Sequence, residues 1–296
     1  MPQAIPVSKE LLRKVRLLAL RTRLKVRDVF SGRYHSVFKG QGMDFDEVRE
    51  YSPGDDVRNI DWNVSARMGH PYVKIYREER ELTILILVDL SASQAFGTAT
   101  ALKREVAAEL TTLLALCALV NNDRVGLLLF TDRMEHFVAP KKGQRHILRL
   151  VRDVLAFQPQ SRGTSISTAM EYALHALRKR SVFFLISDFE GDGYEKPMKV
   201  AARKHDLIGI ELYDRREREI PPAGLVRLKD PETGQVWWTD SSRSNLRRQF
   251  AAAASRRVAS RAAFFKSAGI DRIELPVDKP YLMELIRFFR MRERRR

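Results

Sequence analysis

The sequence has a single cysteine, Cys117, among its 296 residues. One cysteine cannot form an internal disulfide or a thiolate zinc site, so we expect a protein of the reducing cytoplasm. No stretch of eighteen apolar residues occurs, which predicts no insertion into a membrane. The apolar residues near the N-terminus are interrupted by Arg13, Lys14 and Arg16, unlike the continuous apolar core of a secretion signal.

Signatures of several enzyme classes are also missing. The sequence contains neither a Gly-x-x-x-x-Gly-Lys-Ser/Thr phosphate loop nor a Gly-x-Ser-x-Gly nucleophile turn. Its six histidines are scattered without the spacing of metal ligands, at His35, His70, His136, His146, His175 and His205. The sequence therefore gives no sign of a phosphate-loop nucleotide hydrolase or of a serine hydrolase.

Positive charge is abundant, with a formal net charge of +16. Such a charge makes nucleic-acid binding one alternative, because clustered Lys and Arg release counterions from phosphates. The basic residues are spread along the chain, however, with local runs at 13–25, 178–180, 256–261 and 290–296. No zinc finger, aromatic-basic RNA motif or helix-turn-helix is recognisable. We therefore favour solvated faces or an acidic partner surface as the reason for the charge.

Apolar strands alternate with helices from residue 72 onward. The patterns predict strands at 72–77, 82–90, 124–130, 134–138, 181–187, 207–213 and 271–276. They predict helices at 99–120, 144–157, 167–179 and 245–267, with a last one from 280, and a hairpin of 225–228 with 235–239. This order predicts an α/β fold: a doubly wound, mostly parallel sheet flanked by helices. We expect that domain to span residues 81–296.

Residues 1–80 differ in character and form an N-terminal, partly irregular and β-containing extension. A basic amphipathic helix is predicted at 8–29, and residues 31–69 are rich in Gly, Asp, Arg and aromatics without a clear period. A second acidic metal site or hydrolytic centre is one hypothesis for this segment. We favour a network of Arg–carboxylate bridges and turn caps, with Tyr51 and Trp62 buried as anchors, which could also form an interaction surface. Its members are Arg49, Tyr51, Asp55, Asp56, Arg58, Asp61 and Trp62.

Oxygen-bearing side chains follow the predicted strands at three places. Asp89, Ser91 and Ser93 begin at the end of the first buried strand, Thr164 lies in a loop before a helix, and Asp188 follows the strand at 181–187. In doubly wound sheets, ligands bind at the carboxyl ends of strands near the switch in strand order. Hydroxyls and carboxylates suit Mg²⁺, or another divalent cation such as Mn²⁺ or Ca²⁺. Alternatively, Ser91 simply caps a helix.

Two stretches resemble known families. The motif DLSAS is similar to the Asp-x-Ser-x-Ser signature of von Willebrand factor A domains, whose metal-ion-dependent adhesion site is completed by a Thr and a further Asp. The segment GRYHSVFKGQGMDFDEVREYSPGDDVRNIDWNVSAR resembles the hallmark of a bacterial family known as domain of unknown function 58. One departure is Ser165, which stands where many members carry an acidic residue.

The resemblance implies both a site and a function. It implies hydroxyl ligands at Ser91, Ser93 and Thr164, with Asp89 and Asp188 holding the metal mainly through waters. Members of the second family are typically encoded beside MoxR-type AAA+ ATPases and are thought to act with them as adaptors or co-chaperones on client proteins. We therefore expect metal-dependent protein binding without catalysis. The alternatives are a metal-dependent hydrolase or nuclease, for which the motif offers no suitable general base, and a basic nucleic-acid-binding protein.

Overall fold

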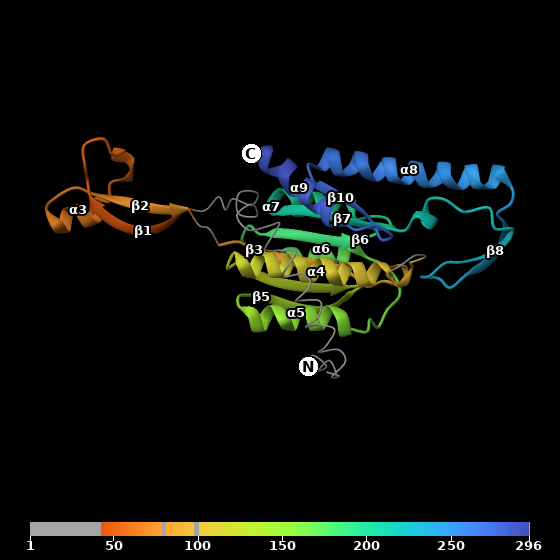
Figure 1. Cartoon of the computed structure of the whole chain (residues 1–296). Helices are drawn as coiled ribbons and strands as arrows, with labels where there is room; N and C mark the ends of the chain where they lie inside the picture. Colours follow the sequence, from red (N-terminus) through yellow and green to blue (C-terminus); the bar gives the residue numbers. More distant parts are fainter. Residues whose placement is uncertain (1–42, 79–80, 98–100, 296) are drawn as a thin grey trace. The chain divides into compact units, whose positions relative to one another are not determined.

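The computed structural model describes residues 43–78, 81–97 and 101–295 (Figure 1). The helix predicted at 8–29 lies outside these residues. The described residues before Thr83 form one compact unit, and those from Thr83 onward form another. In the described part of the chain, no helix combines the length and hydropathy needed to cross a bilayer.

The larger unit is built on a six-stranded sheet, which confirms the predicted doubly wound, mostly parallel α/β fold. Neighbouring strands pair in parallel except at one edge of the sheet, where the strand Met134–Lys141 is antiparallel to its neighbour. The order across the sheet is β10 (Asp271–Pro276), β7 (Asp206–Tyr213), β6 (Val182–Ser187), β3 (Thr83–Asp89), β4 (Arg124–Phe130) and β5 (Met134–Lys141). From β3 the chain adds β4 on one side and later β6 on the other, so strand order reverses at β3.

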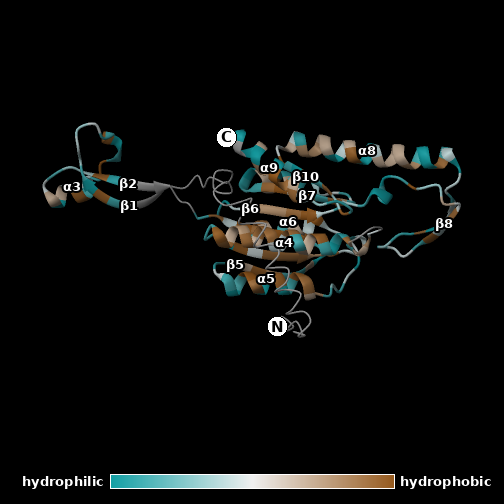
Figure 2. Ribbon diagram, viewed as in Figure 1, coloured by the Kyte–Doolittle hydropathy of each residue, from teal (hydrophilic) through white to brown (hydrophobic). Residues whose placement is uncertain are grey.

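Helices cover both faces of this sheet. One face packs against α6 (Ile166–Ala176), α7 (Glu195–Lys204) and α8 (Ser244–Ala268), which share a buried cluster with alternate residues of β3 and β6. The other carries α4 (Lys103–Val120), which packs on α5 (Gln144–Ala156). Burial on both faces explains why the central strands are continuously apolar. Figure 2 shows the hydrophobic colour along β6.

Several boundaries and one helix differ from the predictions. Helix α7 was not predicted, because its sequence EKPMKVAARK is mostly polar and contains a proline. Helix α4 begins at Lys103 rather than at 99. At this start, the Glu105 side chain accepts a hydrogen bond from the backbone N–H of Leu102 (2.9 Å). The predicted hairpin is confirmed as β8 (Leu225–Lys229) paired with β9 (Val236–Asp240). The C-terminal helix is α9 (Leu282–Arg294).

The smaller unit is more regular than its sequence indicated. Strand β1 (Met43–Glu50) pairs antiparallel with β2 (Tyr72–Glu78), and a short helix α3 (Trp62–Met68) lies between them in sequence. Trp62 is 71% exposed, so the prediction of a buried anchor at this position is wrong. It is the first residue of α3, a helix of seven residues that buries none of them. Tyr51 is half-buried.

Candidate metal centre

The carboxyl ends of β3 and β6 bring two aspartates together. Asp89 is the last residue of β3, and Asp188 directly follows Ser187, the last residue of β6. The Ser187 hydroxyl donates to Asp89 Oδ2 at 2.6 Å, which ties the two strand ends to each other. Both carboxylates are almost fully buried, at 0% and 3% exposure. These strands flank the point where strand order reverses, which is where ligands bind in doubly wound sheets.

Burial and mutual repulsion make a negative charge on Asp89 costly. Desolvation and the nearby charge of Asp188 raise the pKa of Asp89 to about 7, although hydrogen bonds from Ser187 and Ser91 lower it in part. A cation bound beside these carboxylates would favour their ionised forms. The electrostatics of the pair therefore suit the binding of a positive ion.

The loop after β3 places two hydroxyls next to the carboxylates. The backbone N–H of Ser91 donates to Asp89 Oδ1 at 2.9 Å, and the Ser91 and Ser93 hydroxyl oxygens lie 3.0 Å apart. Adjacent ligands of octahedral Mg²⁺ lie roughly 3 Å apart, because each is about 2.0–2.1 Å from the ion. The Ser91 side chain makes no capping hydrogen bond to the short helix that follows, so the alternative role as a helix cap is wrong.

The loop that carries Thr164 is held against the same edge of the sheet. Ala92 N–H donates to the carbonyl of Arg162 at 2.9 Å, and Ser165 N–H donates to the carbonyl of Thr131 at 2.9 Å. The Ser165 hydroxyl accepts from Thr168 N–H, which makes this residue the cap of α6 and explains a serine there. Thr164 itself donates from its hydroxyl to Glu232 Oε1 at 2.6 Å.

A lysine that the sequence analysis did not single out lies beside the site. Lys103 Nζ donates to Asp188 Oδ2 at 2.9 Å and also contacts Glu217, and its side chain is fully buried. Burial alone would lower the pKa of Lys103, but the charges of Asp188 and Glu217 outweigh burial and raise it. The position of Lys103 could have indicated an ion pair, because a cation at the first position of a helix is disfavoured by the helix dipole unless an acidic partner compensates.

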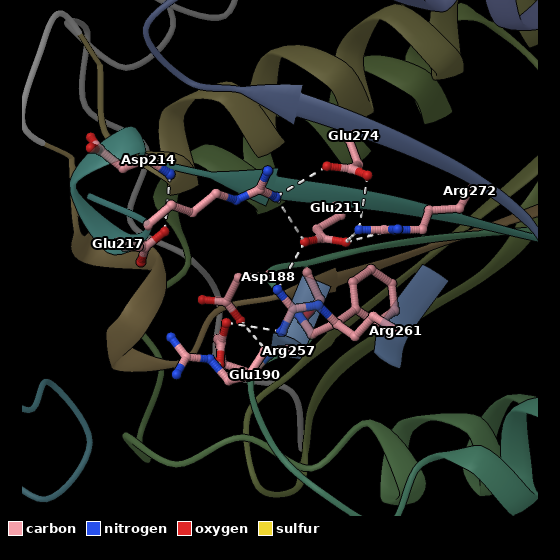
Figure 3. A network of polar contacts seen from close by, with 12 residues as sticks. Asp188, Glu190, Glu211, Asp214, Glu217, Arg257, Arg261, Arg272 and Glu274 are labelled. Carbon is pink, nitrogen blue, oxygen red and sulfur yellow. Dashed lines mark hydrogen bonds and ion pairs between the residues drawn. The ribbon is translucent and has the colours of Figure 1, made fainter. Parts of the chain in front are cut away.

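A network of charges continues from the site along β7. Glu211, fully buried, accepts from three arginines, Arg218, Arg261 and Arg272, at 3.3, 3.1 and 2.7 Å (Figure 3). Arg261 on α8 also donates to Glu190 at 2.9 Å, two residues after Asp188. Glu211 within the apolar run LIGIELY could have indicated this network from the sequence, because a buried carboxylate requires partners.

The backbone after Asp188 adopts an uncommon conformation. Phe189 has φ +54°, in the left-handed region that non-glycine residues rarely adopt. Its ring is buried and packs edge-on against Phe265 of α8 (5.2 Å between centroids) and Tyr194 (6.1 Å). This conformation lets the backbone N–H of Glu190 donate to Asp188 Oδ1 at 3.2 Å. Core packing of Phe189 thus stabilises a strained turn that positions Asp188.

The donor set fits a hard cation. Across the described residues, no group of three His, Cys, Asp or Glu side chains is placed to hold a metal, so binding here would depend on hydroxyls. The two serine hydroxyls are spaced as neighbouring octahedral ligands, and the two carboxylates are already oriented by protein N–H and O–H groups. These carboxylates are therefore suited to receive hydrogen bonds from metal-bound waters.

The predicted network residues of the smaller unit mainly make local ion pairs and backbone caps. Arg49 makes a bidentate pair with Asp55 (2.6 and 2.7 Å), and Asp55 also accepts from Ser52 N–H. Asp56 accepts from the N–H of Arg58, and Asp61 caps α3 through two backbone N–H groups. This arrangement agrees with bridges and turn caps.

Comparison with known proteins identifies relatives of almost the full chain. Uncharacterized proteins of Mycobacterium bovis and Mycobacterium tuberculosis are each 33% identical over 285 residues, covering 95% of this chain and 89% of the relative. Among solved structures, the conserved hypothetical protein BatB from Bacteroides thetaiotaomicron is 16% identical with a TM-score of 0.47, covering 72% of this chain and 99% of its own. The SpRpn10 VWA domain is 12% identical with a TM-score of 0.40, covering 70% and 93%.

The fold assignment depends on the strand order described above, since both TM-scores lie below 0.5. The family is shown by sequence. Residues 47–260 match the family described as Protein of unknown function DUF58. This range contains all five residues of the candidate centre and Glu211, whereas Arg261 and Arg272 lie beyond its end. With that match and the mycobacterial relatives, the chain belongs to the DUF58 family.

Proposed function

We propose that this protein binds a partner protein through a divalent cation held by Asp89, Ser91, Ser93, Thr164 and Asp188, and that it does not catalyse a reaction. The observation that carries the proposal is the 3.0 Å spacing of the Ser91 and Ser93 hydroxyls beside two buried carboxylates. When bound, Mg²⁺ would offer a remaining coordination position to a carboxylate of the partner. Ser91, Ser93 and Thr164 would supply hydroxyl ligands, and Asp89 and Asp188 would hold metal-bound waters.

The chemistry of the site favours binding over hydrolysis. The carboxylates of Asp89 and Asp188 are both engaged by protein donors, and Lys103 is paired with two acids. These contacts fix the orientation of both carboxylates, and the motif offers no further side chain suited to act as a general base. The arrangement therefore supports a ligand-holding role for these groups.

We further propose that the partner is a MoxR-type AAA+ ATPase, for which the protein acts as an adaptor or co-chaperone toward client proteins. Support comes from the family membership and from the net charge of +16, which would complement an acidic face on the partner. A carboxylate–metal bridge in a site of low dielectric would make that contact depend on the cation.

A binding assay with a purified MoxR-type ATPase from the source organism tests this proposal. We expect capture by the wild type in Mg²⁺, loss of capture in EDTA, and loss in Asp89→Ala. The exposed carboxylate of Asp192 lies four residues after Asp188, so Asp192→Ala is the matched control and should bind normally. Capture that ignores both EDTA and Asp89→Ala would contradict a metal-bridged contact.

A further inference from the structure

The Thr164 hydroxyl already has a carboxylate partner from a distant part of the chain. It donates to Glu232 Oε1 at 2.6 Å, across 68 residues of sequence. Glu232 is half-buried and lies in the turn between β8 and β9. The 2.6 Å distance between the Thr164 hydroxyl oxygen and Glu232 Oε1 is close to the separation of roughly 3 Å between adjacent octahedral ligands. The Glu232 carboxylate is therefore in direct contact with one of the proposed ligands.

The turn is built to hold Glu232 in one conformation. Asp230 Oδ1 accepts from the backbone N–H of Glu232 (2.9 Å) and of Thr233 (3.3 Å), and Asp230 Oδ2 accepts from the Thr233 hydroxyl (2.6 Å). Pro231 restricts the backbone between them, and Gly234 completes the turn with φ +74°. Such a turn fixes the backbone from which the Glu232 side chain extends, so less conformational entropy is left to lose.

The hairpin has few other attachments. In the described part of the chain, β8 and β9 pair with each other and with no strand of the main sheet, and Figure 1 shows the hairpin at one end of that unit. Trp237 and Trp238 are 48% and 63% exposed. An isolated two-stranded hairpin is marginally stable in water, so a contact at its turn has a large influence on its position.

We propose that Glu232 is an internal ligand of the metal centre, which occupies the position that a partner's carboxylate takes. This inference rests on the proposed function, because it requires the same ion. A partner must displace Glu232 before its own carboxylate can bind, which lowers its apparent affinity by the fraction of molecules in which Glu232 is released. Displacement also frees the hairpin, with Trp237 and Trp238, to contact the partner.

Binding of Mn²⁺ to the full-length protein tests the ligand role. We expect one Mn²⁺ per chain by calorimetry, and binding weaker by on the order of tenfold in Glu232→Gln. Glu171→Gln, on the exposed side of α6, removes the same charge away from the site and should leave the affinity unchanged. Equal affinities in wild type and Glu232→Gln would overturn the ligand role alone. Failure of the wild type to bind Mn²⁺ would overturn both this role and the proposed function.

Hydrogen exchange of the hairpin amides gives a second readout. In Glu232→Gln, which replaces the charged acceptor of the Thr164 hydroxyl, we expect amides of residues 225–240 to exchange at least several-fold faster without metal. Added Mn²⁺ should slow this exchange in the wild type and in Glu171→Gln but not in Glu232→Gln. Hairpin exchange that is the same in all three proteins, with and without Mn²⁺, would show that Glu232 does not respond to the ion and would overturn the inference.

Discussion

At the scale of single residues, the site is governed by a charge imbalance. Asp89, Asp188 and Glu217 bring three carboxylates together, whereas Lys103 supplies one ammonium. The single ammonium of Lys103 can balance only part of the negative charge that these carboxylates carry when ionised. Lys103 thus stabilises the site in part, and the proposed cation would offset more of its negative charge.

Replacement of Lys103 by Met should reveal both roles. Met fills similar volume but leaves Asp188 and Glu217 without their buried partner, which we expect to lower the free energy of unfolding by about 3–5 kcal/mol. Divalent cations should then bind more tightly, because Asp188 loses a competing positive charge. Urea unfolding with and without Mn²⁺ measures both effects. Lys196→Met, at an exposed position of α7, should change neither quantity.

His205 should make the protein sensitive to acid. Burial, together with the charges of Lys204 and Arg180, lowers the pKa of His205 to about 4, and its ring stacks on Phe183 at 4.1 Å. Neither ring nitrogen has a hydrogen-bond partner among the described residues. The folded state therefore keeps this imidazole neutral, whereas the unfolded chain protonates it below its ordinary pKa of about 6.5.

The sign of the effect follows from this depressed pKa. As the pH falls from 6.5 towards 4, the unfolded chain binds a proton that the folded protein does not, so stability falls by up to about 3 kcal/mol. We expect His205→Leu to remove this part of the acid sensitivity. Unfolding by urea at pH 7.5 and pH 4.5 measures it, and an equal loss of stability in both proteins would contradict this role for His205.

At the scale of elements, the charge network joins α8 to β7 and to the loop after β6. Arg261 from α8 bridges Glu190, in the loop after Asp188, and Glu211 of β7. A displacement of α8 would therefore change contacts on the loop that positions Asp188. The ring of Phe265, also on α8, packs against Phe189 in the same loop.

Glu211→Gln should weaken this connection. Three partly buried arginines would lose their shared negative charge, and we expect a destabilisation of about 3 kcal/mol or more. The backbone amides in the second half of α8 should exchange faster than in the wild type, and this increase should exceed any increase in β6. The exposed pair Arg243–Asp240 gives the contrast, since Arg243→Gln should change stability by less than about 0.5 kcal/mol. Similar effects of the two substitutions would contradict a structural role for the buried network.

At the scale of the whole molecule, the net charge of +16 can assist association without deciding what binds. Binding of the ATPase through a metal bridge should require Mg²⁺ and weaken by less than about tenfold between 50 and 200 mM salt. Binding of duplex DNA through 6–10 phosphate contacts would weaken by roughly 10³–10⁵-fold over the same range and ignore Asp89→Ala. Fluorescence anisotropy with each ligand at the two salt concentrations separates these cases.

Sequence patterns predicted the elements whose residues carry their own signal. The continuous apolar runs at 82–90 and 181–187 predicted two strands, and the structure confirms β3 and β6 there. Helix α7 was missed because its buried residues are few and spaced among charges. Trp62 was placed wrongly in the core, since an aromatic residue offers area to bury but does not fix which way it points.

The sequence by itself determined the alternating α/β fold and the oxygen-rich residues at three strand or loop ends. Only the tertiary structure brought Lys103 to Asp188, Glu232 to Thr164 and three arginines to Glu211. These contacts span 50 or more residues in most cases. Periodicity reports only which face of an element is buried, whereas pairing of distant charges depends on how strands are ordered and how helices cross the sheet.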